Sequence, residues 1–556
     1  MTSATVDSRA DLAEPLGFSG PRARQIRTDA GTVWFEGFVR NRSPEQLATE
    51  ALAATEATVA AWLNGLDGFY RIVVLGRSAA FAACDTVRSY PLIWGRDGTG
   101  LPCISASGPA LETHLNLGQS DIDPGAVVPV TLSGFTIGNE TLYRDVQQIG
   151  PGEYLWLLSG EPEPKRYTVW DAWNVSAEFD PDALPSLHEK LIDDLIRDAD
   201  GRQILVPLSA GLDSRFIASG LKAAGYDNVL TVAYGQKGNR EAETSREIAR
   251  RLGYEWRFVP YTNGALSRMF RSDDYAAFKN LSDSLTSVHF PQEYHAIDTL
   301  LRQGDIDRDT VVVNGQSGDF ITGNHVPASL FDPPDSEEAR LNAIVDGLLN
   351  KHYRQWAALR TPERLNTIAK KLRGLLQSVN APGTDKNGAH GYYEFREFWD
   401  RQSKYVINGQ RLYDHFGLDW RLPLWDRAYM DYWARAPISA KQGQSLYKQA
   451  LHQANWAGVW RDIPVNPTRI RPLWIKPLRL AAKAAHVFAG RAAWHRFEKR
   501  YFEYWMGATC AFAGWPYGTV RTDRRGHHSA IAWHIEDYLN NKGLAWDGSM
   551  LEGRAA

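Results

Sequence analysis

The stretch QILVPLSAGLDSRFIASGLKAAGYDNVLTVAY, residues 203–234, decides the fold of this 556-residue chain. It begins with a short apolar segment, turns at Gly211, continues with a helical pattern and ends in a second apolar segment. Two apolar strands joined by a helix are typical of a βαβ unit in a buried parallel sheet. The sequence therefore predicts an α/β domain built around this unit.

The octet LSAGLDSR, residues 208–215, lies where the first strand meets the helix. Gly211 permits a tight turn, so the unpaired amides of the helix N-terminus can face an anion, and Ser209 and Ser214 add hydroxyl donors. A bare phosphate would repel Asp213, which makes sense mainly as a magnesium ligand beside a phosphate. A plain helix cap uses the same residue types. The complete strand–turn–helix context favours nucleotide phosphates.

Further strand and helix patterns extend from this unit in both directions. Downstream, the helix pattern at 240–253 and the strand EWRFVPY at 255–261 continue the alternation, and VVVNGQSGD at 311–319 repeats the strand followed by a Gly turn. Upstream, LPSLHEKLIDDLIRDA at 184–199 carries leucines at helical spacing and predicts an amphipathic helix. The remainder of the chain is mostly helical and aromatic in pattern.

Residues 31–167 show short strand patterns separated by turns. Four segments rich in β-branched and aromatic residues, TVWFEGFV, FYRIVVLG, AAFAACD and YLWLLSG, predict antiparallel sheet. An Ala-rich helical stretch at 48–63 lies between the first two. We expect an α+β domain here, and we expect residues 162–170 to be a linker.

The bulk composition excludes several classes of protein. The chain is 44% hydrophobic and 23% charged with a formal charge of −3, which is globular and argues against a nucleic-acid binder. Its three cysteines (Cys84, Cys103, Cys510) have no CxxC spacing, so neither a disulfide framework nor a zinc knuckle is expected. The first thirty residues do not resemble a signal peptide, and no apolar run is long enough to cross a bilayer. We expect a cytoplasmic protein.

Several of these segments together resemble a known family. LSAGLDS resembles the SGGLDS pyrophosphate loop of asparagine synthetases and their relatives, which cleave ATP to AMP and pyrophosphate. NGQSGDFITGNH at 314–325 resembles their second pyrophosphate segment, LDWRLPLWD at 418–426 their ARVPFLD segment, and QSLYKQAL at 444–451 their lysine-bearing helix. WLNGLDGFYRIVVL and its neighbours are similar to the glutamine-hydrolysing domain. The resemblance spans roughly residues 30 to 460.

The resemblance implies three regions. Residues 1–170 would be an Ntn-like antiparallel sandwich of the glutamine amidotransferase type. Residues 171–470 would be an ATP-pyrophosphatase domain with the PP-loop, adenine nucleotide alpha hydrolase-like parallel sheet. Residues 471–556 would be a helical extension rich in basic and aromatic residues.

The resemblance also implies how ATP and Mg²⁺ would be bound. The first loop would hold the pyrophosphate, the strand around Val232 and the backbone at Gly315 would hold the adenine, and Gly318 would close the second loop around Asp319. A plain turn role is the alternative for Asp319. The implied ATP-binding residues are Leu208, Ser209, Gly211, Asp213, Ser214, Val232, Gly315, Ser317 and Gly318, and the implied metal ligands are Asp213 and Asp319.

The sequence departs from the family in its N-terminal domain. Class II glutaminases use an N-terminal cysteine whose α-amine serves as the base, whereas this chain begins MTSATV. We therefore expect a retained scaffold without glutaminase activity. Nitrogen would come from free ammonia, another protein or an amine on the substrate.

A second departure concerns the catalytic base. Gln316 stands where asparagine synthetases have Glu and β-lactam synthetases have Tyr, and a Gln side chain cannot take a proton from an attacking amine. Glu394 and Glu397, one helical turn apart near Lys404, are candidate replacements, and a solvated helical charge pair is the alternative. Arg469 or Arg471 is the candidate for a family lysine that stabilises the leaving group.

Residues 469–500 contain nine Lys or Arg and a single acid, with aromatic residues interleaved. Such a stretch can lie on an anionic membrane surface, and residues 469–505 are the candidate contact. The alternative is a helix packed by its aromatics with a basic solvent face. Pro477 and Gly490 are expected to interrupt the continuous apolar face that interfacial binding needs.

The predicted function is ATP-dependent adenylation of a substrate carboxylate, followed by transfer to ammonia or an amine. A carboxylate on a sugar or polysaccharide precursor is the predicted substrate. Intramolecular amide formation, as in lasso-peptide cyclases and β-lactam synthetases, is a second interpretation. A non-catalytic nucleotide-binding scaffold is a third. A tRNA-modifying enzyme is disfavoured because the chain is not basic.

Overall fold

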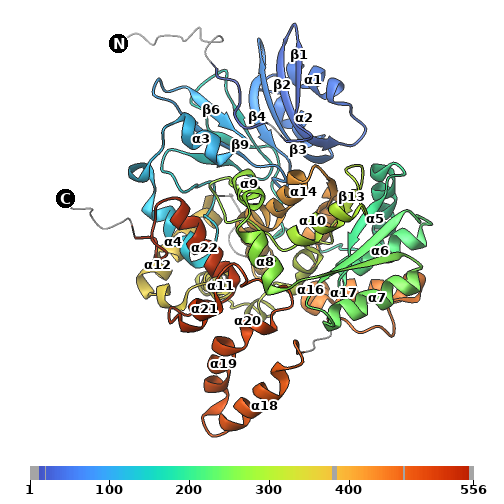
Figure 1. Ribbon diagram of the computed structural model, residues 1–556. Helices are drawn as coiled ribbons and strands as arrows, with labels where there is room; N and C mark the ends of the chain where they lie inside the picture. The colour runs from blue at the N-terminus through green and yellow to red at the C-terminus, as the bar shows by residue number, and fades with distance from the viewer. Residues whose placement is uncertain (1–11, 19, 379–384, 467–469, 550–556) are drawn as a thin grey trace, which may run out of the picture.

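A computed structural model describes residues 12–18, 20–378, 385–466 and 470–549. The N-terminal strands form the upper part of the molecule in Figure 1, and the parallel sheet with its helices lies to the right. Helices α4 (Pro124–Ser133), α12 (Pro362–Ser378) and α22 (Ala530–Asn541) lie on the left side, and α18 (Ile475–Ala485) and α19 (Gly490–Tyr501) protrude at the lower end.

The N-terminal region is a sandwich of two antiparallel sheets, as the strand patterns predict. Side chains such as Trp34 and Val73 from the larger sheet pack against Leu92 and Ile104 from the smaller one. Helices α1 (Pro44–Ala53) and α2 (Val59–Asn64) cover the outer face of the larger sheet. In order, the larger sheet contains β1 (Arg24–Thr28), β2 (Gly31–Val39), β3 (Gly68–Gly76), β4 (Ala80–Cys84), β8 (Glu153–Trp156) and β9 (Pro164–Arg166), and the smaller contains β6 (Pro102–Ser105), β5 (Leu92–Arg96) and β7 (Gln147–Ile149).

Two details of this region differ from the sequence prediction. The helical stretch at 48–63 is broken between α1 and α2, because the Thr58 hydroxyl accepts a hydrogen bond from the Thr55 amide at 2.9 Å and so competes with the helical pattern. The predicted linker at 162–170 contains β9, which pairs antiparallel with β8. A strand containing proline is tolerated there because β9 lies at the sheet edge.

The second region is built on a five-stranded parallel sheet, which confirms the α/β prediction. Every pair of neighbours in the sheet runs parallel, with Ile204 opposite both Val229 and Val311. In spatial order the strands are β12 (Glu255–Pro260), β11 (Val229–Gly235), β10 (Ile204–Pro207), β13 (Val311–Val313) and β14 (Asp419–Arg421). The chain order therefore reverses between β10 and β13.

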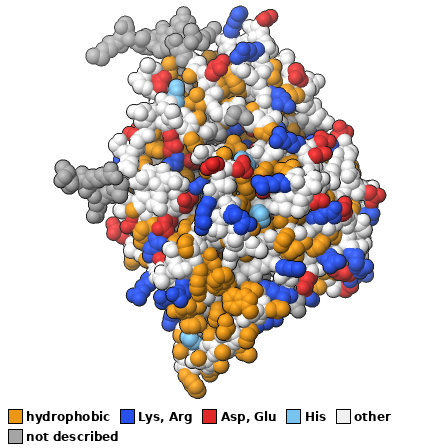
Figure 2. Space-filling view, in the orientation of Figure 1, with side chains coloured by type: hydrophobic (Ala, Val, Ile, Leu, Met, Phe, Trp, Pro, Cys, Tyr) orange, Lys and Arg blue, Asp and Glu red, His pale blue; other side chains and the backbone are white. Residues whose placement is uncertain are grey.

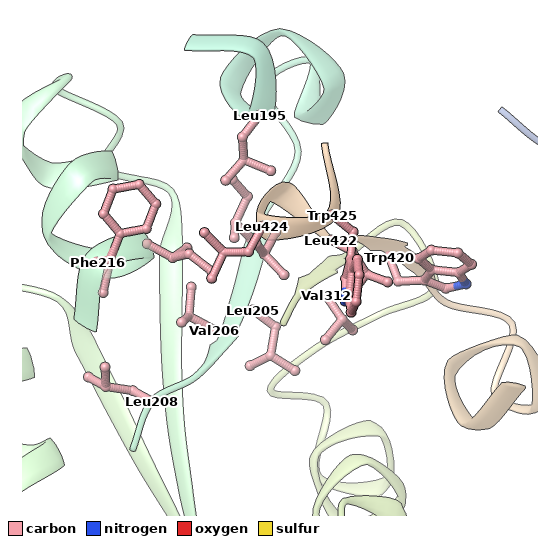
Figure 3. Close-up of a cluster of buried hydrophobic side chains, with 14 of the residues drawn as sticks. Leu195, Leu205, Val206, Leu208, Phe216, Val312, Trp420, Leu422, Leu424 and Trp425 are labelled. Carbon is pink, nitrogen blue, oxygen red and sulfur yellow. The ribbon is translucent and has the colours of Figure 1, made fainter. Parts of the chain in front are cut away.

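The core of this region explains why the strands are so apolar. Leu205, Val206 and Val312 are completely buried, and Figure 3 shows them between Phe216 on one side and Trp420 on the other. Burial on both faces is what a parallel sheet covered by helices requires. The covering helices include α5 (Leu184–Ala199), α6 (Asp213–Ala223) and α7 (Arg240–Leu252).

A helical layer joins the sheet to the rest of the molecule. Residues 398–406 continue α13 with the wider hydrogen bonding of a π-helix. The helices of this layer are α8 (Asn263–Phe270), α9 (Asp273–Ser282), α10 (Tyr294–Gln303), α11 (Glu337–His352), α12 (Pro362–Ser378), α13 (Ala389–Glu397), α14 (Arg411–His415), α15 (Arg427–Ala434), α16 (Ile438–Lys441) and α17 (Ser445–Ala454).

The last helix of the C-terminal region packs into the body of the molecule. Helix α22 (Ala530–Asn541) packs on α4 (Pro124–Ser133), so Trp533 shares one hydrophobic core with Val130 from the N-terminal region. The remaining helices are α3 (Gly108–His114), α18 (Ile475–Ala485), α19 (Gly490–Tyr501), α20 (Glu503–Met506) and α21 (Tyr517–Thr522). Within the described ranges, no helix has the length and apolar character needed to cross a membrane.

Candidate functional site

The candidate site lies where the order of the parallel strands reverses. The loop after β10, residues 208–212, and the loop after β13, residues 314–319, leave the carboxyl ends of two adjacent strands. In open parallel sheets the crevice at this position is where ligands bind, because the two loops diverge to opposite faces of the sheet. The topology therefore brings together the two segments singled out in the sequence.

The first loop is held closed by its own serines. Ser214 Oγ accepts a hydrogen bond from the Ser209 amide at 2.9 Å, and the two hydroxyl oxygens are 3.0 Å apart. The Gly211 amide donates to Ser209 Oγ at 3.0 Å. Helix α6 then starts at Asp213, so the amides of its first turn, which have no acceptor within the helix, point toward the crevice. This arrangement suits an anion.

Two carboxylates from different loops meet at the N-terminus of α6. The Asp319 amide donates a hydrogen bond to Asp213 Oδ2 at 3.0 Å, and the Tyr447 hydroxyl lies 3.3 Å from Asp213 Oδ1. Burial and the neighbouring Asp319 carboxylate raise the pKa of Asp213. A divalent cation would relieve this repulsion, so the donor chemistry fits Mg²⁺ beside a phosphate.

Two glycines of the second loop make this approach possible. A Cβ at Gly315 would lie 2.8 Å from the Ser214 amide nitrogen. A Cβ at Gly318 would lie 2.5 Å from Asp213 Cγ and 2.6 Å from Leu424 Cδ1. Both positions therefore require glycine for close packing against the first loop, as the turn pattern suggested.

A cavity of about 650 Å³ opens in front of these loops. Arg401 and Lys448 bring positive charge to the lining of this cavity. Gly318 is not part of the lining and supports Asp213 from behind. The sequence-predicted residues that line the cavity are Leu208, Ser209, Gly211, Asp213, Ser214, Val232, Gly315, Gln316, Ser317 and Asp319.

Sequence reasoning missed several residues of the cavity wall. Lys448 lies on α17, within the segment that resembles the family's lysine-bearing helix, so the signal was present. Glu293 is half-buried and hydrogen-bonds with Tyr413 and Tyr234. Arg401 and Glu293 follow no motif, and only the folding of distant segments brings them to the cavity.

The predicted catalytic residues Gln316, Glu394 and Glu397 lie in different environments. Gln316 lines the cavity, and its Oε1 accepts a hydrogen bond from Gln410 at 3.0 Å. Glu394 and Glu397 are completely buried behind the wall, so the interpretation as a solvated charge pair is wrong. They are buried because each finds a partner from a distant segment. Lys404, expected beside them, instead contacts Asp400 at 3.2 Å.

Glu394 and Glu397 are held by separate networks. Lys441 Nζ, itself fully buried, donates to Glu394 Oε2 at 2.5 Å, and burial raises the pKa of Glu394 to about 7. Glu397 hydrogen-bonds with His325 Nδ1, whose other ring nitrogen is 3.1 Å from Asp319 Oδ2. His325 lines the cavity, so it connects the Glu397 carboxylate with the Asp213–Asp319 pair.

The predicted arginines lie away from these networks. Arg471 Nε donates to the Gly238 carbonyl at 2.6 Å, and its guanidinium is 3.8 Å from Glu243. This places Arg471 against the loop between β11 and α7 and outside the cavity lining, so the role assigned to it lacks geometric support. Arg469 lies outside the described residues.

Taken together, the sheet and its two loops define an α/β protein with a crevice at the carboxyl end of a parallel sheet whose donors suit a phosphate-bearing ligand. Residues 197–455 match the family model for asparagine synthase. Residues 197–455 are therefore asparagine synthetase-like, and this domain is that of an ATP-dependent ligase that forms amide bonds. A comparison with curated proteins finds no match.

Proposed function

We propose that the protein cleaves ATP to AMP and pyrophosphate, adenylates a substrate carboxylate and passes the acyl group to ammonia or an amine. The observation that carries this proposal is the meeting of the Asp213 loop and the Asp319 loop at the strand reversal, beside a cavity with two cations. We infer that the parallel sheet is a PP-loop nucleotide domain and that the N-terminal sandwich is an Ntn-like scaffold.

In the first step the chain's role is positioning and charge neutralisation. The α6 amides with Ser209 would hold the phosphates, Asp213 and Asp319 would hold Mg²⁺, and the ion would supply charge neutralisation. A carboxylate oxygen attacks the α-phosphorus, the bond to the β-phosphate oxygen breaks, and pyrophosphate leaves. Lys448 and Arg401 line the same cavity and would offset negative charge that develops on the phosphates.

In the second step an amine nitrogen attacks the acyl carbon, AMP leaves, and the nitrogen loses a proton. Gln316 cannot accept that proton. His325 lies at the cavity wall between Glu397 and Asp319, and despite burial these two carboxylates raise the pKa of His325 to about 9. With Asp319 engaged by Mg²⁺, the ring nitrogen that faces Asp319 would become free to take the proton, and Glu397 would orient the ring. The Glu397 candidate is thereby retained as a residue that acts through His325, and Glu394 is assigned to the structural pair with Lys441.

The proposed acceptor is a sugar or polysaccharide carboxylate, and the proposed nitrogen donor is ammonia or an amine. The cysteines offer no glutaminase nucleophile in the described sandwich, because Cys84 and Cys103 are both buried. Intramolecular cyclisation remains the competing function. It requires no ammonium, whereas amidation with ammonia does.

The first experiment measures MgATP binding by calorimetry, since it needs no knowledge of the acceptor. The intact protein is expected to bind MgATP, and Asp213→Asn is expected to weaken binding at least tenfold. The matched control is Asp227→Asn, because that carboxylate is 76% exposed and lies far from the cavity. Absence of MgATP affinity in the intact protein would sink the proposal.

The second experiment measures pyrophosphate release with a panel of uronic acids and other carboxylates, with and without ammonium. Pyrophosphate release that requires both a carboxylate and ammonium supports amidation with ammonia. Pyrophosphate release with a single substrate that carries its own amine supports cyclisation. His325→Ala and Glu397→Gln are expected to slow amide formation about a hundredfold while leaving substrate-dependent ATP–pyrophosphate exchange intact. Loss of both activities in both variants would contradict the base assignment.

A further inference from the structure

The segment 470–505 forms a helical hairpin that protrudes from the body of the protein (Figure 1). Helices α18 and α19 pack on each other through Ile475 and Trp494, and Phe502 completes this small core. His486 stacks near Phe497, with ring centroids 4.5 Å apart. The hairpin is therefore an ordered unit whose inner face is already occupied.

The outer face of α18 is apolar and exposed. Ile475, Arg479, Ala482 and His486 face the small core, at the spacing of one helical face. At 100° per residue the opposite face falls on Pro477, Leu480, Ala481 and Ala484, with Leu478 and Ala485 beside them, and all six residues are exposed. Leu480 is 70% exposed, although burying a leucine side chain is favourable.

The turn between the helices carries the most exposed apolar residues. Phe488 is 100% exposed and Val487 is 66% exposed. Figure 2 shows hydrophobic side chains gathered at this protruding end of the molecule. A convex tip of this kind cannot bury a wide flat area against a rigid partner. It can enter a soft apolar layer.

Of the two breaks expected from the sequence, only the one at Gly490 interrupts the helical stretch, and it lies beyond the end of α18. Pro477 lies in the first turn of α18, where its missing amide costs no intrahelical hydrogen bond. Gly490 starts α19 with a φ of +84°, so it forms the turn that exposes Phe488. The expected break at Pro477 is therefore wrong for the outer face of α18, whereas Gly490 does end the helical stretch, as expected, and forms the turn of the hairpin.

The charge of the hairpin indicates what kind of apolar layer it can enter. Residues 475–501 hold seven Lys or Arg and one acid, and that acid, Glu498, pairs with Arg479 at 2.5 Å. The hairpin thus carries a formal charge of +6. Because the whole chain has a formal charge of −3, the rest of the chain carries −9. Lys476 and Lys483 are exposed along one border of the apolar face, where long side chains can reach headgroups while the apolar face is buried.

We propose that the α18–α19 hairpin binds the protein peripherally to an anionic lipid surface, with Phe488 and the outer face of α18 entering the headgroup boundary. The negative remainder of the molecule is repelled by the same surface, so the hairpin is directed toward it. This inference does not depend on the proposed enzymatic function, because vesicle binding requires neither ATP nor substrate.

Vesicle co-sedimentation tests the proposal with the intact chain. Binding is expected to phosphatidylcholine vesicles that contain phosphatidylglycerol, to be much weaker to phosphatidylcholine alone, and to fall with added salt. Phe488→Asp is expected to weaken binding at least tenfold. Lys476→Glu with Lys483→Glu is expected to weaken it about thirtyfold.

The matched control is Arg24→Glu with Arg27→Glu, which makes the same charge change on β1 at the opposite end of the molecule. It is expected to bind like the unmodified protein. Equal loss in this control, or equal binding to neutral vesicles, would overturn the proposal. So would a concentration-dependent dimer in sedimentation that Phe488→Asp converts to monomer, because a second copy would then be the occupant.

An environment-sensitive label gives a direct readout of insertion. The three native cysteines are buried, so a thiol introduced by Val487→Cys can be labelled selectively with nitrobenzoxadiazole. Its emission is expected to shift to the blue and brighten on anionic vesicles. The same label on Ala53→Cys, an exposed site on α1, should not respond. An unchanged spectrum at position 487 contradicts insertion.

Discussion

At the scale of single residues, the site depends on how closely two loops approach each other. Asp213 is separated from Leu424 only by the backbone of Gly318, which leaves no room for a side chain at 318. The resemblance to asparagine synthetases implied roles for Gly318 and Asp319, and the position of Asp319 after an apolar strand supported its role. It could not predict His325 or Arg401, because their roles arise from contacts between loops distant in sequence.

Replacing Gly318 by alanine is expected to destabilise the protein by about 1–3 kcal/mol, because the new Cβ overlaps buried atoms. The shift imposed on Asp213 should also weaken MgATP binding. Chemical denaturation and calorimetry measure the two effects. The control is Gly374→Ala in α12, where nothing lies within 4 Å of the added Cβ, and a gain of up to about 1 kcal/mol is expected. Equal stability of both variants would refute the packing argument.

At the scale of elements, strongly periodic segments were predicted almost to the residue. The amphipathic pattern at 184–199 coincides with α5, and the apolar runs coincide with β10, β11 and β13. The break between α1 and α2 was missed because side-chain hydrogen bonds from threonine override helical propensity there. Hydrophobic periodicity indicates which residues are buried. It carries little information about where side-chain hydrogen bonds interrupt a helix.

Helix α5 contains a buried histidine that makes stability depend on pH. His188 packs among Phe216, Tyr447 and Trp456, and burial lowers the pKa of His188 to about 3. In the unfolded chain this histidine gains a proton below pH 6.5 and in the folded protein it does not. Its neutral form therefore favours folding above pH 6.5, and that contribution is lost as the pH falls.

Between pH 7 and 5.5 the intact protein is expected to lose about 1 kcal/mol more unfolding free energy than His188→Leu, which has no proton to gain. Urea denaturation of both proteins at a series of pH values measures the difference. Parallel stability profiles for the two proteins would mean that His188 does not remain neutral in the fold.

At the scale of the whole molecule, the first and last parts of the chain share one core. Trp533 of α22 is 2% exposed and packs against Trp356 and Trp515 in the core that also includes α4. Arg40 of the sandwich contacts Asp198 at 3.1 Å and Asp426 at 2.6 Å. The sandwich and the parallel sheet are therefore expected to unfold together.

Trp533→Ala is expected to cost about 3–5 kcal/mol, since it leaves a large cavity in this shared core. Scanning calorimetry should show one transition at a lower temperature. The control Leu480→Ala removes a side chain that is 70% exposed on the hairpin and should change stability by less than about 0.5 kcal/mol. A separate early transition in Trp533→Ala would show that the C-terminal helices fold independently.

Local sequence determined the strands, most helices and the phosphate-binding turn, because hydrophobic period and glycine positions act over a few residues. Only the tertiary structure decided which charges are paired: Lys441 reaches Glu394, and His325 reaches Glu397 across 72 residues. It also decided that Pro477 and Gly490 shape a hairpin. Such pairings depend on which distant segments pack together. An unpaired buried charge is energetically costly, so a buried charge is paired with a partner from the segments packed around it.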